Sequence, residues 1–400
     1  MNITKKILII NSVYGIRSTG RIVKDLHDAA NHHGWESHVI YGRIQQPNEK
    51  NVHYIGNKTQ VVYEMAKTAV FGHHGLGSEL WTNRIIEHIN EINPDIIHLH
   101  NIHGYYVNVA SLFKYLKTLD VPIVWTLHDC WAYTGHCAYY TYVACDKWKT
   151  GCHHCPALKT YPYSILSDRS KKNYLEKREF FTGLNSCTLV TPSKWLSKEV
   201  KTSYLKDYPV EVIPNGIDLE VFKPQEHRSS TRFTILAVAN IWEERKGLKY
   251  CLELAEYLSE DEQLVIIGLN DVQVKGLPKH VIGIKRTESV QELVDWYNRA
   301  DVYINPTLED NFPTTNLEAL ACGTPIITFD TGGSIESVTE STGFVVESNS
   351  LALYEAVLKI KEKGKAEFTL ACRKVALEHF GRDKMKRAYI DLYKRMIENA

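Results

Sequence analysis

Short aliphatic runs alternate with amphipathic stretches along the whole chain. The runs are bounded by polar residues, glycine or proline, which is typical of buried strands. They cover residues 6–11, 37–41, 95–100, 122–128 and 188–191 in one series and 233–239, 264–268, 281–284, 301–305, 325–328 and 343–346 in a second. Strands that alternate with helices form parallel sheets with helices on both faces. We therefore expect an α/β fold with two doubly wound sheets.

The segment between the two series, residues 212–233, has the turn-forming sequence Pro-Asn-Gly at 214–216 and then a polar stretch. We place a domain boundary there, with residues 1–220 in an N-terminal domain and 230–382 in a C-terminal domain. A chain of 400 residues is long enough for two or three domains. The last predicted helix, within 383–400, carries an apolar stripe opposite a basic face.

Composition narrows the class of protein. Hydrophobic residues make up 44% and charged residues 24%, which indicates a globular chain with a proper core. Lys plus Arg and Asp plus Glu number 47 each, so no net charge attracts the whole molecule to nucleic acid or an anionic membrane. No apolar run reaches the roughly 18 residues that span a bilayer, and the chain begins without a cleavable signal. We expect a cytoplasmic protein.

Ligands of open parallel sheets bind beyond the carboxyl ends of the strands. After the first strand, Gly15 and Gly20 lead into a helix, which suits an anion, although a plain strand-to-helix turn is the alternative. After the fourth strand, His128 either contacts a substrate hydroxyl or is an interior histidine. Only part of the His-rich segment 98–103 can face one site, because alternate strand residues point to opposite faces.

In the second series of strands, two further segments follow strand ends and carry candidate ligand-binding residues. Arg245 and Lys246 follow a strand and suit a diphosphate, although adjacent charges in a loop are also typical of a solvated surface. After the strand at 301–305, Asp310 lies in a turn and Glu318 on the helix that follows. Free N–H groups at the start of that helix would face a phosphate, and carboxylates accept from sugar hydroxyls. The ligand that fits this arrangement is a nucleotide-sugar.

These motifs together resemble retaining glycosyltransferase family 4. The block E-D-N-x-P-x-T-x-x-E-A-L-A-C-G-T-P at 309–325 is similar to the E-x7-E signature of that family. Other matching pieces are PNGID at 214–218, RKG at 245–247, TGGSIE at 331–336, STGR at 18–21 and HLHNIHGYY at 98–106. The similarity extends over nearly the whole chain, and these pieces are similar to members of the family that assemble capsule and exopolysaccharide.

The resemblance implies a GT-B fold, in which two Rossmann-like domains face each other across a cleft. The C-terminal domain would hold a UDP- or GDP-linked sugar, the N-terminal domain would hold a glycan or lipid-linked glycan acceptor, and the last helix would pack back on the N-terminal domain. The implied activity is transfer of a hexose with retention of configuration, in capsule, exopolysaccharide or O-antigen synthesis. No Asp-x-Asp motif occurs in the sequence, which fits a metal-independent reaction.

The resemblance also implies roles for individual residues. Glu318 would bind the ribose, Asp310 the transferred sugar, and His128 would lie near the anomeric centre. The implied donor-binding residues are Gly20, Arg245, Lys246, Asn311, Phe312, Pro313, Thr314, Thr315 and Glu318. Two features depart from the family pattern. The first carboxylate is usually Glu, so Glu309 is an alternative to Asp310, and Asn240 stands near the position of the usual loop arginine.

A separate feature is a loop that carries four cysteines: Cys137, Cys145, Cys152 and Cys155. Four soft ligands suit a structural zinc ion in a reducing compartment. Because the spacing is irregular, free or packed thiols and disulfides are alternatives. Neighbouring histidines are alternative ligands. Any zinc there would staple the loop and take no part in catalysis.

Other functions are compatible with parts of the sequence. A GT-B epimerase would release free sugar from the donor, and a phosphorylase would need inorganic phosphate or pyridoxal phosphate. The cysteine loop raises the more distant alternative of a zinc-containing nucleic-acid-binding protein, which the neutral charge disfavours. The cationic and aromatic stretch 168–181 is either a peripheral contact with the inner face of the membrane or an ordinary solvated helix.

Overall fold

The computed structural model describes residues 4–225, 232–278 and 280–399, and the chain divides into two compact units. The first unit extends to Ile213 and includes the chain from Lys386 onward, and the second extends from Pro214 to Met385. The predicted start of the C-terminal domain at residue 230 lies outside the described residues. Within the described part of the chain, no helix combines the length and the apolar character needed to cross a bilayer.

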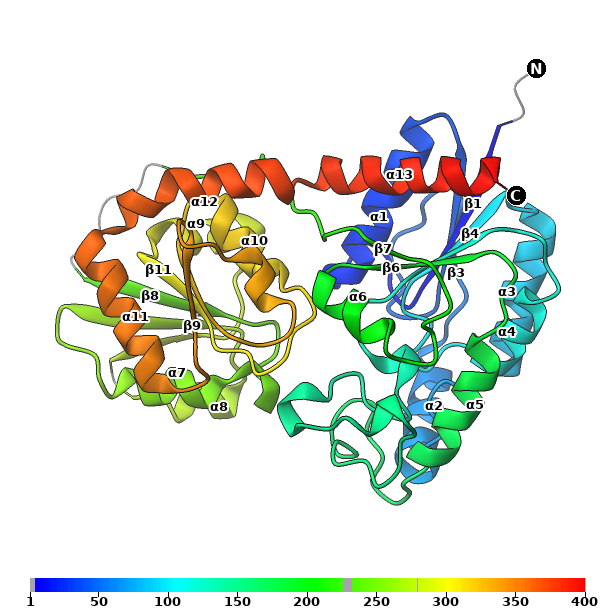
Figure 1. Ribbon diagram of the computed structural model, residues 1–400, viewed down its shortest axis with the longest axis horizontal. Coiled ribbons are helices and arrows are strands. Elements are labelled where there is room, and N and C mark those ends of the chain that lie inside the picture. The colour runs from blue at the N-terminus through cyan, green and yellow to red at the C-terminus, as the bar shows by residue number, and fades with distance from the viewer. Residues whose placement is uncertain (1–3, 226–231, 279, 400) are drawn as a thin grey trace. The chain divides into compact units, whose positions relative to one another are not determined.

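The first unit contains a seven-stranded sheet with the strand order β3-β2-β1-β4-β5-β6-β7 (Figure 1). Every neighbouring pair is parallel. Its strands are β1 (Lys6–Asn11), β2 (Glu36–Tyr41), β3 (Val52–Tyr54), β4 (Ile96–Leu99), β5 (Ile123–Thr126), β6 (Cys187–Thr191) and β7 (Val210–Val212). The central strands β1, β4 and β5 are buried on both faces, which explains their continuous aliphatic runs.

Helices surround this sheet. They are α1 (Arg17–His32), α2 (Lys58–Phe71), α3 (Glu79–Ile92), α4 (Val109–Leu116), α5 (Ser170–Phe181) and α6 (Lys194–Val200), with single 3-10 turns η1 (Trp131–Tyr133), η2 (Thr141–Val143) and η3 (Lys147–Lys149). Polar N-cap residues define where several of these helices begin. Asn57, Ser78, Asn108 and Ser193 each accept a backbone N–H from the first turn of α2, α3, α4 and α6.

The second unit repeats the same winding with six strands in the order β10-β9-β8-β11-β12-β13. The strands are β8 (Phe233–Val238), β9 (Glu262–Ile267), β10 (Val281–Ile284), β11 (Val302–Asn305), β12 (Ile326–Phe329) and β13 (Gly343–Val346). The helices are α7 (Leu248–Ala255), α8 (Asp271–Lys275), α9 (Val290–Arg299), α10 (Thr314–Ala321), α11 (Ser350–Lys363) and α12 (Lys365–His379), with 3-10 turns η4 (Glu244–Lys246) and η5 (Ser334–Ser337). The predicted α/β class with two doubly wound parallel sheets is confirmed.

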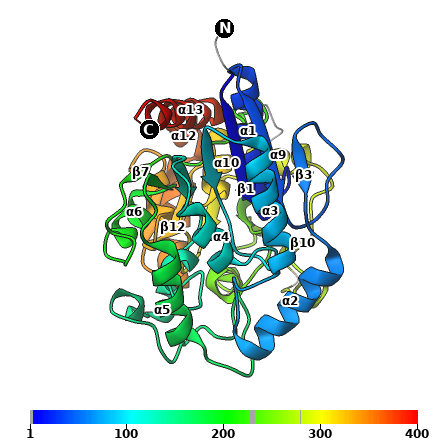
Figure 2. The same ribbon diagram turned by 90° about the vertical axis from the view of Figure 1, so that its right-hand side faces the viewer.

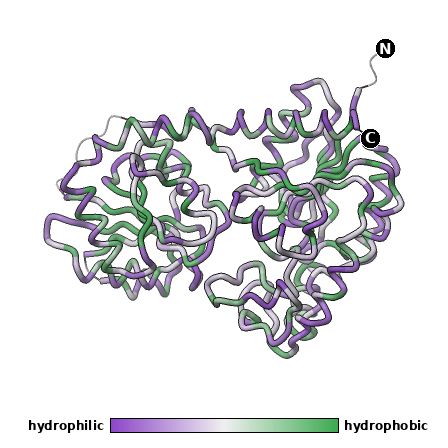
Figure 3. The backbone as a smooth tube through the Cα atoms, viewed as in Figure 1, coloured by the Kyte–Doolittle hydropathy of each residue, from purple (hydrophilic) through white to green (hydrophobic). Residues whose placement is uncertain are grey.

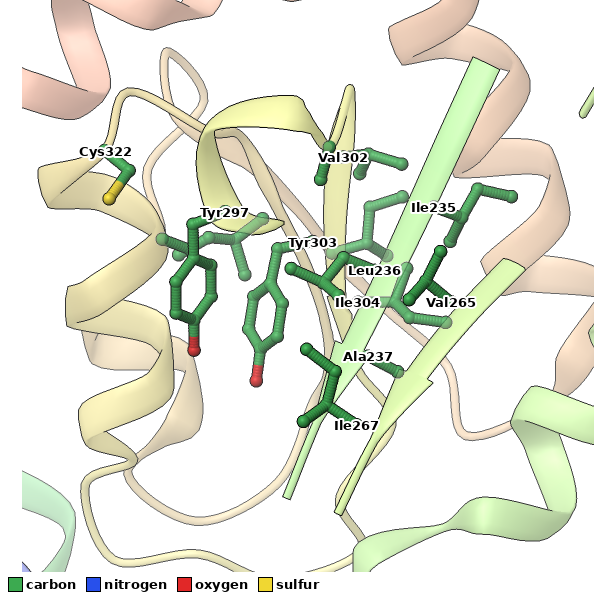
Figure 4. Packing of buried hydrophobic residues seen from close by; sticks show 14 of the residues in the cluster. Ile235, Leu236, Ala237, Val265, Ile267, Tyr297, Val302, Tyr303, Ile304 and Cys322 are labelled. Atoms are coloured by element: carbon green, nitrogen blue, oxygen red, sulfur yellow. The ribbon is translucent and has the colours of Figure 1, made fainter. Parts of the chain in front are cut away.

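Each unit has its own hydrophobic core. The tube in Figure 3 is green, and so most hydrophobic, along the strands of both sheets. In the first unit, the rings of Phe113, Trp125 and Phe181 have centroids 4.6–5.2 Å apart. In the second, Figure 4 shows aliphatic side chains of adjacent strands packed beside the rings of Tyr297 and Tyr303. Burying each such side chain contributes about 1.5–3 kcal/mol to stability.

The last helix, α13 (Arg382–Glu398), crosses the division between the units. In its second half, the hydroxyl of Tyr393 lies 2.7 Å from Nδ1 of His98 on β4, and the hydroxyl of Tyr389 lies 3.0 Å from Oγ1 of Thr126 on β5. Both tyrosines are buried. These bonds fix the C-terminal part of α13 to the carboxyl ends of two central strands of the first unit.

Candidate active site

The topology of each sheet predicts one place where a ligand can bind. The strand order reverses between β1 and β4 in the first unit and between β8 and β11 in the second. Chains leave adjacent strands in opposite directions at such a point, which opens a crevice beyond the carboxyl ends. The residues predicted from the sequence follow β1, β5, β8 and β11, so each group lies at or beside a crevice of its own unit.

In the second unit, the loop after β8 is tied to the loop after β11. The carbonyl oxygen of Arg245 accepts the N–H of Leu308 at 2.7 Å and the hydroxyl of Thr307 at 3.2 Å. The guanidinium of Arg245 donates to the carbonyl oxygen of Glu309 at 3.1 Å. Gly247 has φ +75°, and a Cβ there would lie 2.0 Å from the carbonyl oxygen of Pro306. Only glycine permits this close approach, which sets the position of both cations.

The ammonium group of Lys246 forms a short ion pair with Oδ2 of Asp310. Burial lowers the pKa of Lys246, and the neighbouring Asp310 opposes that effect without cancelling it. Burial by itself raises the pKa of Asp310, but the charges of Lys246 and Arg245 outweigh it and lower that pKa. The pair joins the loop after β8 to the loop after β11.

Glu309 and Asp310, the two candidate sugar-binding carboxylates, differ in how far they are buried. Glu309 is fully buried, and its backbone oxygen is used by Arg245 and Thr307. The Asp310 side chain keeps 16% of its surface exposed. Its Oδ1 also accepts the N–H of Phe312 at 3.3 Å. Asp310 is thus the carboxylate of the two with atoms that a ligand can reach.

The start of α10 offers backbone donors. Its N-cap is Pro313, which has no side chain able to cap the helix, so the N–H groups of the first turn are left to other acceptors. The preceding Asn311 and Phe312 are buried, and the carbonyl of Phe312 accepts a bond from Asn215 at 3.4 Å. With Thr314 and Thr315 in its first turn, this helix end has the partial positive charge that binds phosphate.

Glu318 lies on α10, with 9% of its surface exposed. Its Oε2 accepts the hydroxyl of Tyr297 on α9 at 2.8 Å. On the same helix, the amide of Asn316 bonds to Asn305 at the end of β11 and to Ser337 of η5. These contacts hold α10 and the Glu318 carboxylate in one orientation. The sequence did not link Tyr297 to this site, because Tyr297 lies 21 residues before Glu318 on a different helix.

A third loop, which follows β12, is hydrogen-bonded to the loop after β11. The N–H of Gly333 donates to the carbonyl of Asp310 at 2.9 Å, and Thr331 donates to the carbonyl of Thr307 at 2.7 Å. Gly332 has φ +53°, and a Cβ there would lie 2.3 Å from the Asp310 carbonyl. The TGGSIE motif noted in the sequence therefore supports the Asp310 turn. The second unit brings Arg245, Lys246, Asp310 to Thr315 and Glu318 together.

In the first unit, the loop after β1 closes on itself. The N–H of Gly15 donates to the carbonyl of Gly20 at 2.8 Å. A Cβ on Gly20 would lie 3.1 Å from a methyl group of Val13 and 3.3 Å from the nitrogen of Gly15. The N-cap of α1 is Ile16, which makes no side-chain cap. Gly20 therefore allows the helix start to lie against the loop with first-turn N–H groups free of side-chain caps.

His128 follows β5 and pairs with His100, which follows β4. Nε2 of His128 lies 2.9 Å from Nδ1 of His100, and the rings stack 5.2 Å apart. Burial lowers the pKa of His128 to about 4 and lowers that of His100 well below 6.5. Both rings are thus neutral at pH 7, and one donates to the other. His98 is committed elsewhere, to Tyr393 and Thr126.

Beside this pair lies a second group that the sequence did not reveal. Nε2 of His103 lies 2.9 Å from Oδ2 of Asp129, and its Nδ1 lies 2.8 Å from the hydroxyl of Tyr161. Tyr161 comes from the cysteine-bearing loop, 58 residues farther along the chain. The contact between His103 and Asp129 ties the loop after β4 to the loop after β5, which carries His128.

The four cysteines of the loop form no disulfide in the structure. Cys137 and Cys155 share a hydrogen bond. Among the described residues, the group of His, Cys, Asp or Glu ligand atoms within 4.8 Å of one another is His27, Asp28 and Glu49. The four thiols are not in that group, and a zinc site in the loop stays a prediction.

Comparison with known proteins shows the family to which the chain belongs. The profile of glycosyltransferase family 4 matches residues 19–221, and that of glycosyl transferases group 1 matches residues 232–363. The chain is 24% identical to a colanic acid biosynthesis glycosyl transferase, WcaC, of Escherichia coli K12, over 94% of the chain and 96% of that protein. It is 26% identical to an E. coli UDP-Gal:α-D-GlcNAc-diphosphoundecaprenol α-1,3-galactosyltransferase, over 48% of the chain and 57% of that protein.

Solved structures share the fold. Sucrose-phosphate synthase from Thermosynechococcus elongatus superposes with a TM-score of 0.72 at 16% identity, covering 99% of this chain and 100% of the other. Anabaena HepE in complex with UDP-glucose superposes with a TM-score of 0.65 at 13% identity, covering 98% and 99%. These proteins have the GT-B fold, as expected from the sequence. The chain therefore belongs to glycosyltransferase family 4 and is a glycosyltransferase with two Rossmann-like domains of the GT-B type.

Proposed function

We propose that the protein transfers a hexose, with retention of configuration, from a UDP- or GDP-linked sugar to a glycan or lipid-linked glycan. The observation that carries this proposal is the arrangement around α10. The carboxylates of Asp310 and Glu318 lie on either side of an uncapped helix start, and Lys246 is paired to Asp310. Such a site matches a ligand with a sugar at each end and a diphosphate between them.

In this proposal, the second unit binds the donor. Glu318, held by Tyr297, accepts the ribose hydroxyls, and Asp310 accepts hydroxyls of the transferred sugar. The N–H groups at Thr314 and Thr315 and the cations of Arg245 and Lys246 stabilise the diphosphate as it leaves. Asn311, Phe312 and Pro313 shape the turn between these parts. A cation that already neutralises Asp310 is in place to take up the phosphate charge that develops during the reaction.

In the chemical step, the bond between the anomeric carbon and the phosphate oxygen breaks, and a bond to the acceptor oxygen forms. The proton of the acceptor hydroxyl passes to the leaving phosphate on the same face of the sugar, without a covalent enzyme intermediate. His128 is neutral, since its pKa is about 4, so its role is a hydrogen bond near the anomeric centre rather than proton donation. Gly20 gives the first unit a second backbone surface for the donor.

The names of similar proteins support a nucleotide-sugar donor and a glycan or lipid-linked glycan acceptor. HepE is solved with UDP-glucose, and the E. coli relatives are named for colanic acid synthesis and for transfer to a diphosphoundecaprenol sugar. A lipid-linked acceptor would bring the enzyme to the membrane surface, which agrees with the membrane-contact interpretation of 168–181 rather than with the alternative of a solvated helix. None of the relatives named above favours an epimerase, a phosphorylase or a nucleic-acid-binding protein. Zinc in the cysteine loop stays a prediction, for metal analysis of the purified protein.

A donor and acceptor screen tests the proposal. UDP- and GDP-hexoses are incubated with oligosaccharides and with polyprenyl diphosphate-linked sugars, and the product is analysed by mass spectrometry and NMR. We expect one nucleotide class to support transfer and the product to keep the anomeric configuration of the donor. Free sugar formed without an acceptor would indicate an epimerase instead, dependence on inorganic phosphate would indicate a phosphorylase, and an inverted product would contradict the mechanism.

A further inference from the structure

Helix α2 has its polar and apolar faces reversed relative to an ordinary surface helix. Its buried side chains are Glu64 and Thr68, with 4% and 2% exposed. Its apolar side chains face outward, with Val62 63% exposed and Tyr63 59% exposed. Val70 lies two turns after Val62 on the same face and is also exposed. An amphipathic helix of a globular domain normally turns its apolar stripe to the core, so this face requires a partner.

The exposed apolar face continues onto a neighbouring turn of the chain, residues 163–166. The N–H of Ile165 donates to the carbonyl of Ala69 on α2 at 2.8 Å, which fixes the turn to the C-terminal end of the helix. Ile165 is 73% exposed, Leu166 75% and Phe71 56%. Figure 2 shows α2 at the edge of the first unit. We call this surface the α2 patch: Val62, Tyr63, Met65, Val70, Phe71, Tyr163, Ile165 and Leu166.

The surroundings of the α2 patch are basic. Between residues 158 and 178 there are six Lys or Arg residues and two acidic residues, in a chain whose charges balance overall. Of these cations, Lys177 is buried and Arg169 pairs with Glu176, and the other four are exposed. Lys159 is exposed in the segment that hydrogen-bonds to the turn, through the Ser164 N–H and the Leu158 carbonyl at 2.9 Å. Lys171 and Lys172 are exposed on the first turn of α5, which follows the patch directly. Cations beside exposed aromatic and aliphatic side chains match an anionic bilayer surface.

We propose that the α2 patch is a membrane-docking surface that inserts its apolar side chains into the interface of an anionic bilayer. Aliphatic tips such as Ile165 and Leu166 enter the acyl boundary, the rings of Tyr63 and Phe71 lie at the headgroup level, and the lysines contact lipid phosphates. The turn and the helix end are hydrogen-bonded to each other, so they meet the bilayer as one surface. This proposal goes beyond sugar transfer and is independent of which donor the enzyme uses.

Vesicle co-sedimentation of the full chain tests this proposal. We expect binding to phosphatidylcholine–phosphatidylglycerol vesicles that exceeds binding to pure phosphatidylcholine vesicles and weakens with salt. The triple variant Phe71→Ser, Ile165→Ser, Leu166→Ser should lower the partition coefficient at least about tenfold. These side chains are exposed, so thermal unfolding of the variant should match that of the wild type.

Two further variants test whether vesicle binding depends on the α2 patch and on the lysines beside it. The matched control Leu370→Ser, Leu377→Ser removes side chains that are 83% and 54% exposed on α12 of the second unit, and it should bind vesicles like the wild type. Lys171→Glu with Lys172→Glu should remove most of the preference for anionic vesicles, a loss of about tenfold.

Several results would overturn the proposal. One is failure of the wild type to bind either vesicle, and another is equal binding by the wild type and the triple variant. A third is a lipid-free dimer, seen by sedimentation equilibrium, that the triple variant alone abolishes, because the patch would then be covered by a second copy of the chain. The assay contains no donor or acceptor, so its failure is distinct from failure of the proposed transfer activity.

Discussion

Lys246 and Asp310 form an ion pair between two loops that lie 64 residues apart in the sequence. The pair joins the loop after β8 to the loop after β11, the two strands at which the order of the second sheet reverses. A donor that uses Asp310 for its sugar and Lys246 for its phosphate therefore finds both groups already positioned. Their mutual contact favours the charged form of each group in a partly buried site.

Replacing Lys246 by methionine should lower kcat/KM for transfer by about 10²–10³-fold, because one preorganised donor to the leaving phosphate is lost. Steady-state kinetics with a fixed acceptor measure this. Lys361→Met is the matched control, since Lys361 pairs with Glu262 at 2.7 Å at the opposite, amino-terminal edge of the same sheet. It should change stability without changing kcat/KM. Equal losses in the two variants would show that Lys246 acts through folding alone.

Asp310 and Glu309 can be distinguished by paired variants. Asp310→Asn should reduce kcat strongly with little change in the melting temperature, because its carboxylate is reachable by a ligand. Glu309→Gln should mainly lower stability, by about 1–3 kcal/mol, because its side chain is fully buried. Kinetics and chemical unfolding are measured on both proteins. A loss of activity confined to Glu309→Gln would reverse the assignment.

Tyr297 should tune the nucleotide site through Glu318. Tyr297→Phe removes the hydroxyl that donates to Oε2 of Glu318, and a bond to a charged group contributes about 1.5–3 kcal/mol. We expect a Kd for the nucleoside diphosphate that is at least about tenfold weaker, with kcat nearly unchanged at saturation. Tyr354→Phe is the control, because Tyr354 donates to Glu262 at the far edge of the sheet. An unchanged Kd for Tyr297→Phe would separate Tyr297 from the site.

The buried histidines of the first unit should make the protein sensitive to acid. Burial lowers the pKa of His128 to about 4 and those of His74, His98 and His100 well below their ordinary value of 6.5. Between these values the unfolded chain binds protons that the folded chain does not. The histidine contribution to stability is therefore complete above about pH 6.5 and decreases as the pH falls toward 4, by up to about 1.4 kcal/mol per pH unit for each group.

Urea unfolding between pH 7 and pH 5 measures this dependence. The free energy of unfolding should fall across that range in the wild type, and replacing His100 by Asn should make the decrease shallower. Replacing the exposed His33 by Asn should leave it unchanged. Stability that is flat from pH 7 to pH 5 would contradict the burial of neutral histidines.

Much of the fold followed from local pattern. The strands of both series lie where uninterrupted aliphatic runs place them, because strands covered on both faces lose the alternation of polar and apolar residues. The three-residue strands β3 and β7 were missed, since such short edge strands carry too few residues to form a pattern. The position of α2 was not predicted either, because its buried side chains include Glu64 and Thr68 and its apolar residues face away from the core.

The site was predictable where its parts are contiguous. The stretch from Asp310 to Glu318 could be read from the sequence because turn, helix start and carboxylates follow one another. The contacts that hold it could not, since Tyr297 and Lys246 come from other elements: Lys246 was a candidate phosphate ligand, but its pairing with Asp310 was not predicted. In the first unit, likewise, the bonds of His103 to Asp129 and Tyr161 depend on how a long loop folds over the strand ends.

The most direct test of the central claim is calorimetric binding of UDP, GDP, ADP and NAD to the wild type and to Glu318→Ala. We predict that one nucleoside diphosphate binds and that Glu318→Ala abolishes or strongly weakens that binding, which would also identify the donor class. If none binds, if NAD alone binds, or if Glu318→Ala binds the nucleotide like the wild type, the donor site around α10 is contradicted.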